Sequence, residues 1–112
     1  LAAEVTIDDS TADATNQVAA GANVVFVSDQ TGYVFYVDST ADVVYRKTTD
    51  GGATWGDPVV IDGTTPAVSW TAVGIWYDQW TPGGTGSKIH IGASEPTNDD
   101  TWYHYLDTAD DS

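Results

Sequence analysis

The stretch Thr48-Thr49-Asp50-Gly51-Gly52-Ala53-Thr54-Trp55 decides how this chain folds. Gly51 and Gly52 supply backbone conformations with positive φ at low steric cost, as a tight turn between two strands requires. Asp50 is placed to accept hydrogen bonds from nearby backbone amides, and the flanking threonines to bond the polar groups of the turn. Trp55 adds a large ring to bury beside it. The predicted structural turn consists of Thr48, Asp50, Gly52, Thr54 and Trp55.

Two other interpretations of this stretch compete with a dedicated structural turn. One is an ordinary Asp-Gly hairpin turn followed by a chance tryptophan. The other is a calcium loop, which fits poorly because Asp50 stands without the regularly spaced oxygen ligands that Ca²⁺ requires. The acidic clusters at residues 8–9, 98–100 and 107–111 are expected to be solvated turns, with Ca²⁺ as the weaker alternative. No cofactor is predicted.

The eight residues fit the pattern Ser/Thr-x-Asp-x-Gly-x-Thr-Trp without a mismatch. This pattern resembles the Asp-box, the turn signature of the sialidase-like (BNR-repeat) β-propeller superfamily. The resemblance implies a blade architecture, in which the box is a folding device set away from the active site. A looser similarity links residues 42–46 and 105–108 to repeats in large phage and marine-microbe surface proteins.

Hydrophobic periodicity predicts an all-β chain. Short β-branched and aromatic runs, each bounded by turn residues, are typical of strands, and no stretch shows a capped helical period. Several runs are apolar on both faces, which indicates strands covered from both sides. The runs occupy residues 24–27, 33–37, 43–45 and 59–61.

An internal repeat divides the chain in two. Residues 5–8 return as 59–62, 23–29 as 72–78, 33–36 as 88–91, and 42–46 as 100–104. We therefore predict two consecutive four-stranded antiparallel propeller-like blades. The first repeat spans residues 1–58 and carries the Asp-box, whereas the second spans 59–112 and carries a degenerate, truncated box. A small β-sandwich is the alternative.

Two blades alone leave sheet faces and edges exposed, because propellers need more blades to close. The expected partners are therefore further copies of the chain or the rest of a longer polypeptide. A fragment of a larger propeller or fibre ranks first, a ring of identical copies second and a two-sheet sandwich third.

Composition excludes several classes of function. The net charge is −14, with 17 acidic residues against three Lys and Arg, so the chain repels nucleic acid and anionic membranes. No cysteine is present, which rules out disulfides and thiolate metal sites. No apolar run approaches membrane-spanning length. The Thr-, Gly- and Asp-rich, Lys-poor composition indicates an extracellular or virion-surface location.

An enzyme made by this chain alone is not expected. The resemblance implies an arginine triad and a Tyr–Glu nucleophile pair, yet Arg46 is the only arginine and neither Glu4 nor Glu95, both in predicted loops, has an evident tyrosine partner. The alternative is a segment of a sialidase-like glycoside hydrolase whose catalytic residues lie elsewhere. His90 and His104 are expected on adjacent strands of one hairpin, where a zinc pair would lack a third ligand.

Aromatic residues carry the binding hypothesis. Strand alternation places Trp76, Asp78 and Trp80 on one face, where rings beside a carboxylate suit the stacking of a sugar. The competing interpretation makes Trp70 and Trp76 part of the core between blades. The sequence thus favours a non-enzymatic structural or adhesion module of Asp-box propeller type, with glycans as candidate ligands.

Overall fold

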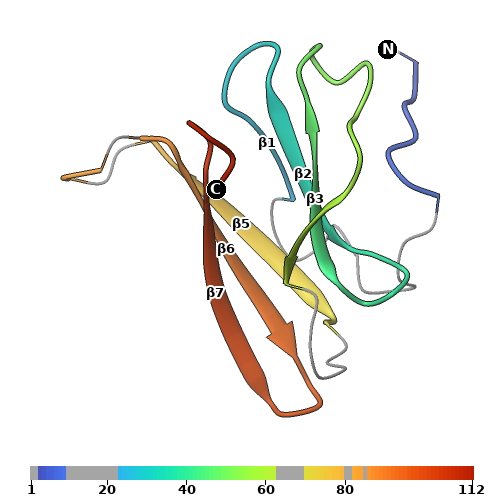
Figure 1. The fold of residues 1–112 in the computed structure, drawn as a ribbon, viewed down its shortest axis with the longest axis vertical. Coiled ribbons are helices and arrows are strands. Elements are labelled where there is room, and N and C mark those ends of the chain that lie inside the picture. The colour runs from blue at the N-terminus through green and yellow to red at the C-terminus, as the bar shows by residue number, and fades with distance from the viewer. Residues whose placement is uncertain (1–2, 10–22, 63–69, 80–81, 85) are drawn as a thin grey trace.

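The computed structural model describes residues 3–9, 23–62, 70–79, 82–84 and 86–112, and these ranges contain strands and turns but no helix. The strands are β1 (Val24–Phe26), β2 (Gly32–Val37), β3 (Val43–Thr48), β4 (Val59–Asp62), β5 (Ala72–Asp78), β6 (Lys88–Glu95) and β7 (Asp100–Asp107). They form two antiparallel sheets, which lie side by side in Figure 1. The predicted all-β class is confirmed.

The first sheet has the order β1-β2-β3-β4, so each strand pairs with its neighbour in the chain. The pairing of β3 with β4 contains a register shift between Val43 and Val44. The repeat deduced from the sequence placed residues 59–62 at the head of the second unit. In the structure these residues form the outer strand of the first sheet, because they pair with β3.

The second sheet has the order β5-β6-β7 and contains three strands among the described residues, where four were predicted. Its pairing is regular, with Trp76 opposite His90 and His90 opposite Tyr105. Glu95, expected in a loop, is the last residue of β6 and is buried. Its carboxylate accepts hydrogen bonds from the backbone amides of Thr97 and Asn98 (3.1 Å for the latter), which closes the β6–β7 turn.

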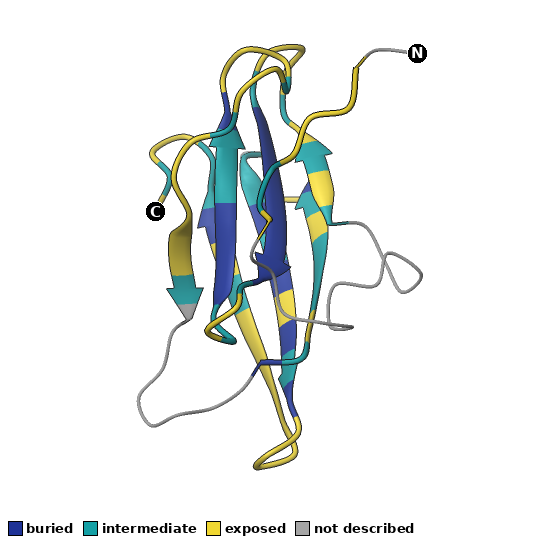
Figure 2. Cartoon of the chain, turned by 90° about the vertical axis from the view of Figure 1, so that its right-hand side faces the viewer, coloured by how far each residue is buried: buried dark blue, intermediate teal, exposed yellow. Residues whose placement is uncertain are grey.

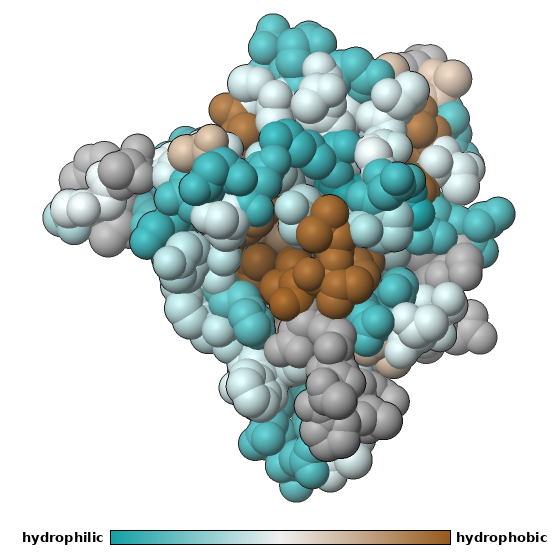
Figure 3. All heavy atoms as spheres, in the orientation of Figure 1, coloured by the Kyte–Doolittle hydropathy of each residue, from teal (hydrophilic) through white to brown (hydrophobic). Residues whose placement is uncertain are grey.

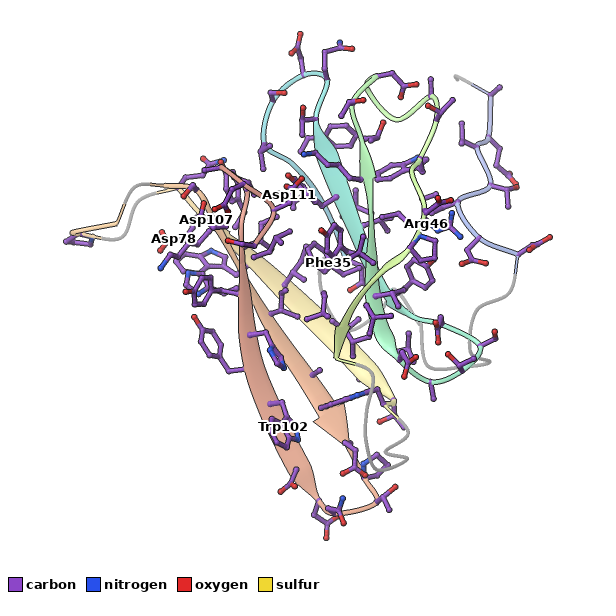
Figure 4. The ribbon with its side chains drawn as sticks, in the orientation of Figure 1. Phe35, Arg46, Asp78, Trp102, Asp107 and Asp111 are labelled. Atoms are coloured by element: carbon purple, nitrogen blue, oxygen red, sulfur yellow. The ribbon has the colours of Figure 1, made fainter. Side chains whose placement is uncertain are left out.

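The main core fills the space between the two sheets. Phe35 is fully buried and points into this space in Figure 4, and β2 is buried along its whole length, as Figure 2 shows. The largest cluster joins both sheets and contains Tyr33, Phe35, Tyr45, Ile89, Ile91 and Leu106. Burial of this apolar surface supplies most of the free energy that holds the sheets together.

Asp111, in the turn after β7, ties the second sheet to the first. The Tyr33 hydroxyl donates to Asp111 at 2.6 Å, and the Lys47 ammonium donates to the other carboxylate oxygen at 2.6 Å. Burial, together with the bond to the Asp111 carboxylate, raises the pKa of Tyr33, so its phenol stays protonated and remains a donor. We call these two hydrogen bonds to Asp111 the latch. They join strands β2 and β3 to the turn that follows the second sheet, where Figure 4 labels Asp111.

Within the described part of the chain, no helix long and apolar enough to span a membrane is present.

Candidate functional site

The turn after β3 is held by its own side chains. Thr48 donates to Asp50 at 2.8 Å and accepts from the amide of Gly52 at 3.0 Å. Asp50 accepts from the amide of Thr54 at 2.9 Å and from its hydroxyl. These bonds, led by the Thr54 hydroxyl and amide, lower the pKa of Asp50 to about 2. The side-chain bonding expected from the sequence is thus present.

Glycine is required at the tip of this turn. Gly51 has φ of 73° and Gly52 has φ of 94°, a region that side chains disfavour. The ring of Trp55 meets Phe26 edge-to-face, with ring centroids 6.3 Å apart. Phe26 in turn lies over Gly32, where an added Cβ would approach its ring to 2.8 Å. The turn therefore packs against the β1–β2 hairpin rather than facing a ligand cavity.

The turn after β7 occupies the equivalent place in the second sheet. Lys88 pairs with Asp107 as Tyr33 pairs with Lys47, which aligns Thr108-Ala109-Asp110 with Thr48-Thr49-Asp50. Asp111, with φ of 59°, stands where Gly51 stands in the first turn. This register moves the sequence match of β3 with β7 by two residues, and under it the second turn shares the Thr-x-Asp sequence of the first.

The outer face of the second sheet, which points away from the first sheet, carries a row of exposed aromatic rings. Trp76 stacks on His90 with ring centroids 5.4 Å apart and planes 24° apart. His90 stacks on Tyr103 at 5.9 Å and 23°. Trp76 is 61% exposed and Tyr103 64% exposed. We call this group, with the half-exposed Tyr105, the aromatic ridge.

A chain of polar contacts crosses the ridge. His90 Nε2 lies 3.3 Å from a carboxylate oxygen of Asp78, and Nδ1 lies 2.8 Å from the Tyr103 hydroxyl. The contacts run from β5 through β6 to β7 and fix the imidazole between its two neighbouring rings. Asp78 lies on the side of the second sheet that is remote from Phe35 in Figure 4.

A shallow trough adjoins the ridge on the same face. Gly74 pairs with Gly92, and neither would bring an added Cβ within 4 Å of another atom. The hollow measures about 230 Å³ and is lined in part by Ala72, Ser94 and Thr101. It falls below the roughly 300–1,000 Å³ typical of pockets for drug-sized ligands. The outer face therefore combines a raised aromatic half with a depressed glycine half.

A second hollow lies between the sheets. It measures about 220 Å³ and is bordered by Val59, Val60 and Ile61 of β4 and by His104 and Leu106 of β7. Figure 3, which has the orientation of Figure 1, shows hydrophobic side chains gathered at the centre of the face turned to the viewer. Leu106, which borders this hollow, also belongs to the inter-sheet core. The hollow is therefore a gap where the two sheets diverge.

The structure brings together two of the three predicted ligand-binding residues. Trp76 and Asp78 lie on the outer face, on the same side of β5. Trp80 lies outside the described residues. Trp70, which one interpretation grouped with Trp76, is 2% exposed and packs with Val37 and Ala93 between the sheets. Tyr103 was missed because only the pairing register places it beside His90.

The two histidines do not form a zinc pair. They lie on adjacent strands of one hairpin, as predicted, but His90 faces outward while His104, opposite Ile91, faces the other side of the sheet. Among the described residues, no group of three or more His, Cys, Asp or Glu is arranged to hold a metal ion.

The single arginine is engaged in the first sheet. Arg46 donates to Asp8 at 3.1 Å, to the Tyr36 hydroxyl at 2.8 Å and to the carbonyl of Gly56 at 3.2 Å. The Tyr36 hydroxyl and the Asp8 carboxylate outweigh desolvation and raise the pKa of Arg46. The guanidinium thus anchors the N-terminal segment, and Arg46 lies on the opposite side of the molecule from Asp78 in Figure 4.

Comparison of the chain with protein-family models, with curated protein sequences and with solved structures gave no match.

Proposed function

We propose that the chain is a non-enzymatic structural module of Asp-box propeller type, built to receive a further β-sheet on the outer face of its second sheet. The two sheets then correspond to two blade-like units. An extracellular or virion-surface location belongs to the same proposal, supported by the acidic, Lys-poor and Cys-free composition.

One observation carries the proposal: the exposed face of the second sheet is the repeat equivalent of the buried face of the first. Phe35 and Tyr45 pair on the inter-sheet face of the first sheet, and His90 and Tyr105 pair in the same positions of the second. The first pair is buried, with Phe35 at 0% and Tyr45 at 6% exposure, whereas Tyr105 is 50% exposed. A large exposed aromatic patch marks an interaction site.

NMR amide shifts over a range of protein concentrations test this proposal. If a sheet packs on the outer face, the amide chemical shifts of Gly74 and Gly92 change as the protein concentration rises, because these two residues line the trough. The amides of Gly51 and Gly52 serve as an internal control, since they belong to the Asp-box turn. Shifts that spare Gly74 and Gly92 would overturn the proposal.

Glycan recognition is a second candidate function for the same face. It is favoured by the exposed ring of Trp76, because aromatic faces stack on sugars. Asp78, on the same side of β5, is buried, and its carboxylate lies 3.3 Å from His90 Nε2. A glycan array probed with the chain and with Trp76→Ala tests it. Binding that is lost in the variant supports this candidate, and an array without signal removes it.

A further inference from the structure

We infer that the sheet received by the outer face is the same face of a second copy, so that two chains form a closed two-fold dimer. This inference rests on the proposed function and names its partner. The face is self-complementary on β5 and β6, because Trp76 and His90 of the aromatic ridge lie in the row next to Gly74 and Gly92 of the trough.

The pairing register arranges the face in four rows across β5, β6 and β7. In order along the strands these rows are Asp78–Lys88–Asp107, Trp76–His90–Tyr105, Gly74–Gly92–Tyr103 and Ala72–Ser94–Thr101. The second row is aromatic, whereas two of the three residues in the third row are glycine. On β5 and β6 bulky side chains thus lie directly beside glycines, whereas on β7 both rows carry a tyrosine.

A two-fold axis that runs across the strands, between the second and third rows, superposes unlike rows. Trp76 then lies over the partner's Gly74, and His90 lies over the partner's Gly92. On β5 and β6 each copy inserts a ring where the other has glycine, which produces the interdigitation that close packing of two sheets requires. On β7, Tyr105 lies over the partner's Tyr103. Both halves of the contact are identical, as in any isologous interface.

The charges on the face suit the same arrangement. The axis places the Asp78–Lys88–Asp107 row over the partner's neutral row of Ala72, Ser94 and Thr101. The charged rows of the two copies lie about six residues apart along the strand, which is roughly 20 Å at about 3.3 Å per residue. This exceeds the Debye length of about 8 Å at physiological ionic strength, so like charges do not meet at the contact.

A head-to-tail arrangement lacks a matching surface. It would need the outer face of the first sheet, which carries Val34, Tyr36 and Val44, and all three residues are already buried. Asp8 is also bonded to Tyr36 on that face. The exposed aromatic face of one copy therefore packs against the same face of the second copy. Because it is only three strands wide, the dimer is expected to be weak and concentration-dependent.

Sedimentation velocity and native mass spectrometry of the 112-residue chain, over a wide concentration range, test the inference. We expect a species of twice the monomer mass and nothing larger. Gly92→Leu fills the trough, and the open space at Gly92 lets the monomer accept the new side chain. It should weaken the dimer at least about tenfold, which corresponds to about 1.4 kcal/mol.

The matched control is Ala53→Leu, which adds the same side chain at an exposed position of the Asp-box turn. It should leave the dimer unchanged, and both variants should melt like the parent chain at low concentration. Species larger than a dimer that disappear in Gly92→Leu would overturn the two-fold arrangement but keep the proposed function. A monomer at every concentration, or a dimer that Gly92→Leu leaves intact, would overturn the two-fold dimer.

Discussion

Among single residues, aspartate has two distinct structural roles at equivalent turns. Asp50 closes the first turn by accepting bonds from Thr54, and glycine provides the positive φ beside it. In the second turn Asp111 itself adopts positive φ, and its carboxylate reaches Tyr33 and Lys47 of the first sheet. The change from glycine to aspartate thus exchanges backbone freedom for a bond between sheets.

The Asp50 carboxylate predicts an acid-dependent loss of stability. Its pKa is lowered from 3.8 to about 2 in the folded chain, so the ionised group stabilises the fold above about pH 4. That contribution is lost as the pH falls from about 4 through about 2. In thermal melts, Asp50→Asn should lower Tm at pH 7 and show a smaller drop across this acid window. Asp57→Asn, at an exposed position, is the control and should lose Tm with acid as the parent chain does. An equal fall of Tm with pH in the parent chain and in Asp50→Asn would contradict the lowered pKa of Asp50.

Removal of the Tyr33 hydroxyl tests the latch between the sheets. Tyr33→Phe leaves the ring in place but deprives Asp111 of a hydrogen bond, which should lower the free energy of unfolding by about 1–3 kcal/mol in urea titrations. Tyr105→Phe removes a hydroxyl from a half-exposed ring and should have little effect. Equal losses in the two variants would show that the bond to Asp111 contributes nothing particular.

At the scale of the strands, sequence predicted which residues form strands better than it predicted which strands pair. The runs at residues 33–37 and 43–45 became β2 and β3 because β-branched and aromatic residues fit a pleated, buried surface. The run at 59–61 became β4 of the first sheet, since hydrogen bonding to β3 depends on where the turn returns the chain. A local repeat carries no information on that partner.

The two faces of equivalent strands should respond differently to truncation. Phe35→Ala empties a site in the inter-sheet core and should cost about 3–5 kcal/mol of unfolding free energy. Trp76→Ala removes an exposed ring and should cost no more than about 1.5 kcal/mol, the size of an aromatic pair contact. Chemical denaturation at low protein concentration measures both values. A larger loss for Trp76→Ala than for Phe35→Ala would mean that the core lies on the outer face.

At the scale of the whole molecule, charge opposes folding. The net charge is −14, and the Lys47 and Arg46 side chains are already paired with carboxylates. Like charges spread over a small surface repel one another and destabilise the compact state. The fold is held by the inter-sheet core against this repulsion.

Salt should therefore stabilise the chain. Raising the ionic strength from about 0.01 M to about 1 M shortens the Debye length from about 30 Å to about 3 Å and screens the repulsion. We expect Tm to rise by several degrees in calorimetry at low protein concentration. A variant that combines Asp9→Asn, Asp57→Asn and Asp100→Asn, all at exposed positions, should show a smaller rise. An unchanged salt response in this variant would contradict the electrostatic explanation.

The sequence alone determined the all-β class, most of the strand positions and the bonding of the Asp50 turn, because alternation and turn chemistry are local properties of the chain. It also placed Trp76 and Asp78 on one side of a strand, since side chains alternate strictly. Only the tertiary structure decided that Trp70 is buried while Trp76 is exposed, and that Tyr103 joins His90. Those outcomes depend on which sheet covers which face and on the register between strands, and both are set by contacts between residues far apart in the sequence.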